Sequence, residues 1–356
     1  MTPSEQATPA VPKRTARDWV LELAKYREPS TRRSVMELVV TLVPFVALWA
    51  LAWVSLSISY WLAFGIASLN GAFLVRIFII QHDCGHQSFF KSRKVSDWVG
   101  RVLGVLTLTP YDVWRRTHSI HHAQHGNLDK RGIGDVLTLT VAEYRARSAF
   151  GRLVYRVYRH PLVLFVLGPS YLFILQNRLP LGLMKSGWRY WTSAMGTNAM
   201  IAIGLALIIY LGGLMPVLLI YLPTSVIAAT IGVWLFYVQH QFEETHWAKD
   251  DEWQLHEAAL EGSSHYVLPG PLRWITGSIG IHHVHHLYSR IPFYRLSEVL
   301  RDHRDLAEAQ RLTIRESLAT VRMHLWDEQH KRLMSFREER RLNRAASAGQ
   351  NGSASI

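Results

Sequence analysis

The sequence predicts an all-α integral membrane protein, with four transmembrane helices in two hairpins and a cytoplasmic helical cap that carries clustered histidines. Two stretches of the chain, residues 38–75 and 190–242, contain no Asp, Glu, Lys or Arg. Each is far longer than the ~20 residues that a helix needs to cross a bilayer, and each is therefore long enough for a hairpin. A helix at the surface of a soluble protein would carry charge on its outer face, which argues against a soluble fold.

The chain is expected to divide into an arm, a membrane domain and a charged end. Residues 1–34 are polar and basic, lack the apolar core of a secretory signal, and predict a cytoplasmic arm. The membrane domain is expected over residues 35–310. Residues 311–356 are expected to form a cytoplasmic helix, to about residue 345, and then a tail of disordered composition. The four spans are predicted at about residues 36–56, 61–80, 198–214 and 217–237.

The charge distribution predicts how the protein is oriented. Neither hairpin tip, near residues 55–60 and 211–216, carries a charge, whereas basic residues precede and closely follow the first hairpin. The positive-inside rule therefore places both termini and the segment between the hairpins in the cytoplasm, and we expect a multi-pass protein of the bacterial inner membrane. The net charge of +12 fits a surface over anionic lipid and requires no nucleic acid. Shorter apolar segments at 97–110 and 161–176 are predicted to lie in the interface or dip into the membrane.

Histidines are concentrated on the predicted cytoplasmic side. Histidines spaced i, i+3 and i+4 share a helix face and can bind one ion, and neutral imidazole is the commonest metal ligand in proteins. The eight or nine imidazoles gathered here exceed the ligands of one tetrahedral ion, so two ions fit better. Because imidazole suits Zn, Cu, Fe and Ni, ligand type leaves the metal open. The candidates are His82 and His86 in QHDCGH, His118, His121 and His122 in RRTHSIHH, His240 in VQHQFEETHW, and the histidines of IHHVHH.

The last cluster, IHHVHH, has one histidine more than the second cluster. Helix geometry alone allows His282 and His286 to share a face with either His283 or His285. Only the triplet with His285 repeats the spacing of the second cluster, so we predict that His283 is a neighbour of the ligands rather than one of them. The isolated histidines are interpreted as ordinary hydrogen-bonded side chains, and these are His160, His256, His265, His303, His324 and His330. The same interpretation is favoured by a smaller margin for His125 and His246.

These clusters resemble the three histidine boxes HxxxH, HxxHH and HxxHH of the membrane fatty acid desaturases. The boxes here read HDCGH (82–86), HSIHH (118–122) and HHVHH (282–286), and the resemblance runs from about residue 36 to residue 300. The sequence of the first box, HDCGH, and the segment that begins with the third box, HHVHHLYSRIPFYRL, look most like the delta-12/omega-3 branch, which acts on an already monounsaturated acyl chain.

The resemblance implies a di-iron centre that uses O2 and two electrons to remove two hydrogens from adjacent carbons of an acyl chain, in a membrane lipid or an acyl thioester. It implies the eight box histidines as ligands, with a ninth ligand near the end of the fourth span; we assign this to His240, with His246 as the rival. Cys84 is the only cysteine and cannot build an iron–sulfur cluster, so electrons are expected from a separate ferredoxin or small cytochrome. The implied iron ligands are His82, His86, His118, His121, His122, His240, His282, His285 and His286.

No catalytic side chain is predicted beyond the metal ligands, but neighbouring polar groups are expected to orient the imidazoles by hydrogen bonding to their free ring nitrogens. These candidates are Asp83, Asp129, Asp135, Glu243, Glu244 and His283.

Two other functions remain compatible with parts of the pattern. A hydroxylase or ketolase of carotenoid, alkane or lipid would share the same histidines, and these alone do not separate it from a desaturase. A non-enzymatic metal transporter would carry ligands near the middle of the bilayer, whereas the predicted spans contain no histidine except at their cytoplasmic ends.

Overall fold

The computed structural model describes residues 15–353, and this part of the chain contains four helices that are long and apolar enough to cross a membrane. They are α2 (Thr31–Ser55), α3 (Tyr60–Gly85), α9 (Trp188–Gly212) and a fourth span, Val217–His240, in which the π-helical turn η4 (Val217–Tyr221) leads into α10 (Leu222–His240). Only 11% of the most apolar part of α9 is buried within the protein, which leaves the rest to face lipid. The predicted mainly helical fold with four spans is confirmed.

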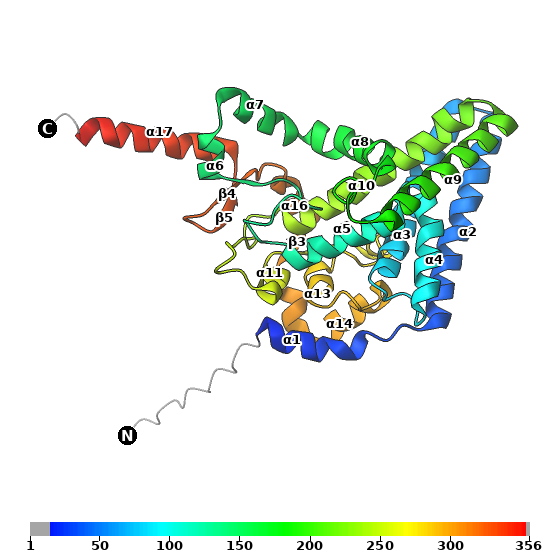
Figure 1. The fold of residues 1–356 in the computed structure, drawn as a ribbon, viewed down its shortest axis with the longest axis horizontal. Helices are drawn as coiled ribbons and strands as arrows, with labels where there is room; N and C mark the ends of the chain where they lie inside the picture. Colours follow the sequence, from blue (N-terminus) through cyan, green and yellow to red (C-terminus); the bar gives the residue numbers. More distant parts are fainter. Residues whose placement is uncertain (1–14, 354–356) are drawn as a thin grey trace, which may run out of the picture.

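The spans form two hairpins whose connections are short. Ser59 caps the start of α3, where its hydroxyl accepts a hydrogen bond from the Leu62 N–H at 3.4 Å. Gly213 ends α9 in a left-handed conformation, with φ at 71°, that suits a residue without a side chain. The central helix is α3, which packs on α2, α4 (Arg93–Leu106) and α10, and Figure 1 shows these helices side by side on the right of the molecule.

Short helices and two small sheets form a cap at one end of the spans. It is built from segments between and after the hairpins, together with the chain before the first span. The remaining helices are α1 (Ala16–Leu23), η1 (Ala24–Tyr26), α5 (Tyr111–Gln124), α6 (Val141–Ala146), α7 (Ala149–Tyr158), η2 (Val163–Leu167), α8 (Gly168–Ile174), η3 (Gln176–Arg178), α11 (Leu255–Glu261), α12 (Gly270–Ile275), α13 (His282–Leu287), η5 (Phe293–Arg295), α14 (Leu296–Asp302), α15 (Arg304–Glu308), α16 (Ile314–Thr320) and α17 (Phe336–Ser353).

The predicted helix over residues 311–345 is wrong, because three short strands lie within it. A parallel pair joins β2 (His265–Val267) to β3 (Arg311–Thr313). In the second sheet β4 (Leu325–Asp327) lies between β1 (Leu139–Thr140) and β5 (Arg332–Met334). Tertiary burial overrides the charged composition here: the side chains of Leu325, Trp326 and Leu333 are at most 1% exposed, and strand pairing satisfies the backbone groups buried with them.

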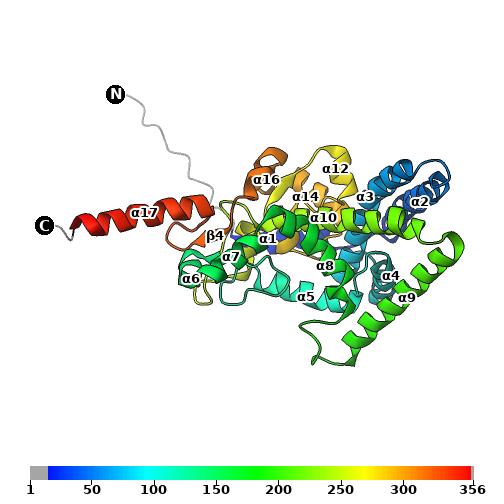
Figure 2. The ribbon, with the colours of Figure 1, turned by 90° about the horizontal axis from the view of Figure 1, so that it is seen from above.

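The two ends of the chain differ in their packing. α1 and η1 lie against the cap, with Trp19 and Leu23 buried and the Tyr26 hydroxyl donating to Asp302 Oδ2 at 2.6 Å. α17 reaches Ser353, into the tail that composition predicts to be disordered, and it extends away from the body opposite the spans (Figures 1 and 2). The first fourteen residues of the predicted arm and the last three of the tail lie outside the described residues.

The apolar segment 161–176 does not form a straight span. It belongs to a helix pair, Ala149–Tyr158 and Val163–Arg178, that bends by 58° at its break. The exposed apolar side chains of α7 recur at helical spacing along one face, as expected for a helix in the membrane interface. They are Phe150, Leu153, Val154 and Val157.

Close packing of α3 on α10 generates a testable prediction. A Cβ atom added at Gly71 would lie 2.9 Å from Ile227 Cγ2 and 3.2 Å from the Thr224 carbonyl oxygen, whereas one at Gly65 of the same helix would meet nothing within 4 Å. We expect Gly71→Ala to destabilise the protein by about 1–3 kcal/mol through overpacking, and Gly65→Ala to have little effect. Thermal unfolding of both variants in detergent measures this; equal unfolding temperatures would contradict the close helix contact.

Candidate metal centre

The three histidine clusters and His240 meet at one end of the spans. The last turn of α3 and its C-terminal cap supply the first cluster, α5 the second, the end of α10 supplies His240, and α13 supplies the last cluster. Their ring nitrogens form two groups, and within each group the nitrogens that can bind a metal lie within 4.8 Å of one another. The first group is His82, His86, His118, His122 and His285; the second is His121, His240, His282 and His286.

Two helices contribute to both groups. On α5, His118 and His122 enter the first group, while His121 enters the second. On α13 the distribution is reversed: His285 belongs to the first group, whereas His282 and His286 belong to the second. The rings of His122 and His286, one from each group, stack with centroids 4.0 Å apart and planes 12° from parallel. The two groups are therefore adjacent and share their supporting helices.

The imidazole nitrogens make more contacts with one another than their N–H groups can satisfy as hydrogen bonds. In the first group the Nε2 atoms of His118 and His86 lie 3.0 Å apart, and His122 Nε2 is 3.1 Å from those of both His118 and His285. Two nitrogens that bind one ion at ~2.1 Å with a ~90° angle lie ~3 Å apart. Each neutral ring has a single N–H, so such a chain of Nε2 atoms leaves lone pairs facing one another, which a bound cation would satisfy.

In the second group, too, Nε2 atoms of different rings lie close together. His240 Nε2 lies 3.2 Å from His121 Nε2 and 3.0 Å from His282 Nε2. His286 Nε2 is buried and makes no hydrogen bond within the described residues. A buried nitrogen without a partner is costly, and a metal ion is the partner that this donor set fits.

Burial keeps these rings neutral. It lowers the pKa of His118, His122, His285 and His286 well below the usual value of 6.5, and the neighbouring imidazoles lower it further. The uncharged form with a free lone pair, which is the form that binds metal, is therefore present at neutral pH.

Two carboxylates and one carbonyl hold the outer nitrogens of these rings. Asp135 Oδ1 lies 2.6 Å from His121 Nδ1. Asp83 Oδ1 lies 3.3 Å from His82 Nδ1, and its other oxygen accepts the Phe293 N–H at 2.6 Å. The carbonyl of Gly262 lies 3.4 Å from His240 Nδ1. Such contacts fix ring orientation and direct the opposite nitrogen inward.

The expectation for Glu243, Glu244 and Asp129 is wrong. Glu243 and Glu244 are exposed, and Glu243 forms an ion pair at 2.9 Å with Arg332. Asp129 is also exposed and accepts the Asp250 N–H. After α10 the chain turns, and Gln241 and Thr245 take the buried positions beside His240, which leaves both glutamates outside.

His283 is buried but lies outside both groups. Its Nε2 lies 2.8 Å from the Leu306 carbonyl oxygen, and its ring neighbours His265 rather than the converging imidazoles. His246 is likewise outside both groups, with Nδ1 3.5 Å from Glu261.

His125 is the residue that sequence reasoning missed. Its ring centroid lies 4.1 Å from that of His240 and 5.1 Å from that of His286, and with His121 and Asp135 it forms a further set that could hold a metal. Burial lowers its pKa to about 4. Its Nε2 contacts the Gly262 carbonyl oxygen at 2.8 Å. The sequence did contain a signal for His125, because a residue four positions after His121 lies on the same helix face.

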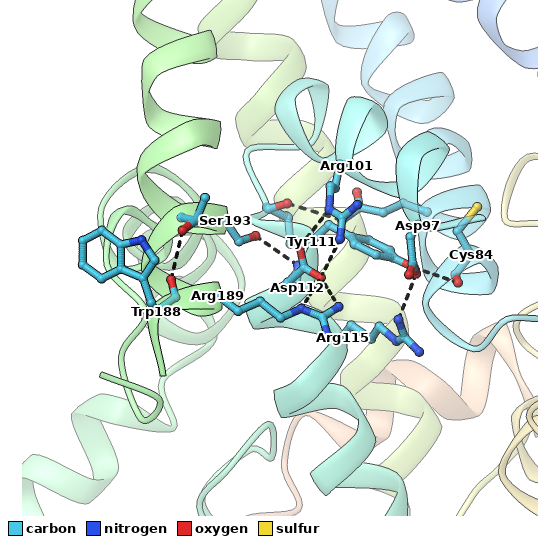
Figure 3. A network of polar contacts seen from close by, with 12 residues as sticks. Cys84, Asp97, Arg101, Tyr111, Asp112, Arg115, Trp188, Arg189 and Ser193 are labelled. Atoms are coloured by element: carbon cyan, nitrogen blue, oxygen red, sulfur yellow. Dashed lines mark hydrogen bonds and ion pairs between the residues drawn. The ribbon is translucent and has the colours of Figure 1, made fainter. Parts of the chain in front are cut away.

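A polar network outside the histidines fixes α5 against α3, α4 and α9 (Figure 3). Asp97 of α4 accepts hydrogen bonds from Arg115 Nη1, at 2.8 Å, and Gln87 Nε2, at 2.8 Å. The Tyr111 hydroxyl lies 2.9 Å from Asp97 Oδ1 and 2.8 Å from the carbonyl oxygen of Cys84. Cys84 lies between the two histidines of the first cluster in the sequence. Asp97 thus connects the helix that carries the first cluster to the helix that carries the second.

The same network continues toward the membrane surface. Asp112 of α5 is buried and pairs with Arg101 Nε at 2.9 Å and with Arg189 Nη2 at 2.5 Å, while its backbone N–H donates to Ser193 Oγ at 3.1 Å. These contacts join α4, α5 and the start of α9 (Figure 3). No motif in the sequence indicates this network: most of its members lie between Cys84 and Arg115, but Arg189 and Ser193 come from a distant part of the chain.

The Asp135–His121 contact generates a second prediction. Asp135→Ala removes the carboxylate that orients His121, and we expect metal affinity to fall about 10–100-fold. Asp129→Ala is the matched control, because Asp129 is exposed in the same loop and contacts no histidine of either group. Metal content after dialysis against a graded chelator measures the effect, and equal metal retention in the two variants would contradict the orienting contact.

Comparison with known proteins agrees with this arrangement. The family model described as fatty acid desaturase matches residues 59–318. A fatty acid desaturase of Bacillus subtilis (strain 168) is 44% identical over 318 residues, which cover 89% of each chain.

More distant relatives include two proteins named as omega-3 desaturases. An endoplasmic reticulum omega-3 fatty acid desaturase of Vigna radiata is 29% identical over 252 residues, 65% of this chain and 62% of that protein. A sn-1 acyl-lipid omega-3 desaturase (ferredoxin) of Synechocystis is 29% identical over 242 residues, 64% of this chain and 63% of that protein. The resemblance read from the histidine clusters is confirmed: the chain belongs to the fatty acid desaturase family and is an oxygen-dependent oxidoreductase of that family.

Proposed function

We propose that this protein introduces a cis double bond into a membrane acyl chain, of the delta-12/omega-6 type, by means of two iron ions, O2 and two electrons. The observation that carries the proposal is the pair of adjacent imidazole groups built from shared helices. A single ion would leave one group of converging lone pairs without a partner, and family membership favours iron over the other metals that imidazole binds.

Nine histidines are proposed as ligands. One ion would be held by His82, His86, His118, His122 and His285, and the other by His121, His240, His282 and His286. His240 is preferred over His246 as the ninth ligand because its Nε2 lies among the nitrogens of the second group.

When bound, the two iron ions supply with O2 the oxidising power that an unactivated C–H bond requires. The residues of the chain hold neutral imidazoles in place through Asp83, Asp135 and the Gly262 carbonyl. They also provide an apolar approach. Trp114 stacks on His118 with ring centroids 4.5 Å apart, and the Phe236 ring centroid lies 5.1 Å from that of His121. We propose that the acyl chain reaches the metal groups past these two aromatic side chains, which would exclude water beside it.

The substrate carrier and electron donor are proposed from the relatives. The Synechocystis relative is named as an acyl-lipid enzyme that uses ferredoxin. We therefore propose an acyl lipid as substrate and a separate ferredoxin, or a small cytochrome in its place, as electron donor. The basic residues flanking the first hairpin support a location in the bacterial inner membrane with the cap and both termini in the cytoplasm.

Iron content provides the most direct test of the ligand set. The purified protein is expected to hold two iron ions per chain, one for each group. His285→Ala should lose iron and activity. His283→Ala should keep part of both, because His283 contacts the Leu306 carbonyl instead of the other imidazoles. Iron measured by elemental analysis, together with turnover, decides this. Equal losses in the two variants, or one zinc ion per chain in active protein, would contradict the assignment.

Product analysis tests the reaction itself. Expression in a bacterial host that makes monounsaturated but no diunsaturated acyl chains should yield a second cis double bond at the delta-12 position, identified by mass spectrometry of derivatised lipids. The His285→Ala variant serves as the inactive control. Unchanged acyl chains accompanied by hydroxylated or keto products from lipid, alkane or carotenoid would contradict the desaturase proposal and favour a hydroxylase or ketolase.

A further inference from the structure

A cavity of about 260 Å³ lies between the start of α2, the cap-side half of α3, α12 and the segment around η5. No histidine of the two metal groups lines it, so it is distinct from the proposed site of reaction. Nothing in the proposed desaturation requires this cavity, yet three arginines and one glutamate are among the residues that line it.

Three arginine side chains and a single carboxylate line this cavity. Arg76 and Glu37 are at most 2% exposed and form an ion pair, and Arg33 Nη2 lies 2.7 Å from the other oxygen of Glu37. Arg76 is further held by Thr41 Oγ1 at 3.0 Å and by the Trp274 carbonyl oxygen. Arg273 is exposed, and its guanidinium makes no ion pair or hydrogen bond within the described part of the chain. The cavity therefore has an excess of positive charge, which favours an anion.

Two hydroxyl groups add hydrogen-bond donors. Ser278 and Ser297 both line the cavity, with their oxygens 3.3 Å apart. Ser278 has a φ of 54°, a left-handed conformation that is unusual for a residue with a side chain. It follows Gly277, where a Cβ would come within 2.7 Å of Ile79 Cγ2. Unfavourable backbone conformations of this kind are retained where they position a group for binding, and here the positioned group is a hydroxyl beside the arginines.

The rim of the cavity carries side chains that are typical of a membrane surface. Trp274 lines the cavity and is 43% exposed, and Leu272 on the same short helix is 46% exposed. Arg33 is in the first turn of the span α2, next to the outward-facing Met36 and Val39. Tryptophan and arginine beside exposed apolar residues are typical of the boundary where lipid headgroups lie. The anion that can reach this position while anchored in the bilayer is the phosphate of a lipid.

We propose that this cavity binds the phosphate of an anionic membrane phospholipid, held by Arg33, Arg273 and the hydroxyls of Ser278 and Ser297, with the Arg76–Glu37 pair beneath it. The bound lipid connects the first span to α12 and so to the cap that carries the metal groups. It is a second lipid site, separate from the acyl substrate, and it stands whether the reaction is desaturation or another oxidation.

Native mass spectrometry of the full chain in detergent tests this proposal, with phosphatidylglycerol as the anionic probe and phosphatidylcholine as the zwitterionic one. The wild type should retain one phosphatidylglycerol in preference to phosphatidylcholine. Arg273→Gln should weaken phosphatidylglycerol binding about fivefold, the effect of losing one basic group at an anionic membrane surface, and Arg33→Gln combined with it should weaken binding further. Arg315→Gln is the control, since Arg315 is exposed on α16 and does not line the cavity.

The outcomes separate the possible sources of the anion. Equal phosphatidylglycerol affinity in Arg273→Gln and Arg315→Gln would overturn the site, and equal retention of the two lipids would overturn the preference for an anionic lipid. Displacement of phosphatidylglycerol by millimolar inorganic phosphate, without any gain in thermal stability from the lipid, would assign the cavity to free phosphate instead. Unchanged iron content in all variants keeps the result independent of the metal centre.

Discussion

Convergence of uncharged imidazole nitrogens from four separate segments is the constraint on which the rest of the structure depends. A metal-binding nitrogen must be buried, neutral and aimed at its neighbours, and each of these conditions has a structural origin. The spans α3 and α10 pack against one another and bring His82 and His240 to the same end of the bundle. The cap helices α5 and α13 then close over that end with three histidines each. Since each of these two helices serves both groups, the placement of one helix positions ligands of both.

Burial of so many polar rings is costly unless their outer nitrogens are paired. Asp83, Asp135 and the Gly262 carbonyl supply such pairing for three of them. Because the inner nitrogens face one another, metal binding should contribute to the stability of the cap itself, as in other sites where ligands come from distant segments. The Asp97 and Asp112 networks act one layer further out, since they fix α5 against the membrane helices without contacting a metal group (Figure 3).

Buried charged groups in the described part of the chain are paired with an opposite charge or make hydrogen bonds. Asp112 has two arginines, and Glu37 has Arg33 and Arg76. Arg159 is 1% exposed without a carboxylate, but its guanidinium donates to the carbonyls of Leu137 and Met323 and to Gln241 Oε1. Arg159 thereby ties α7 and the segment before β1 to the residue that follows His240. Arg273 is different, because it is exposed and its guanidinium has no partner among the described residues; it lines the cavity where an external anion is proposed.

The sequence by itself determined the membrane class, the four spans, the three histidine clusters and the relation to fatty acid desaturases, because span length, charge exclusion and i, i+3, i+4 spacing are local properties of the chain. It also favoured His285 over His283 as a ligand, by comparison with the second cluster and with the family pattern. Only the tertiary structure decided how the histidines divide between two groups, which depends on how α5 and α13 are rotated about their axes. It likewise brought in His125, excluded Glu243 and Glu244, turned part of residues 311–345 into strands and created the arginine-lined cavity. These features arise from contacts between residues far apart in the chain, where burial and partner geometry override local composition.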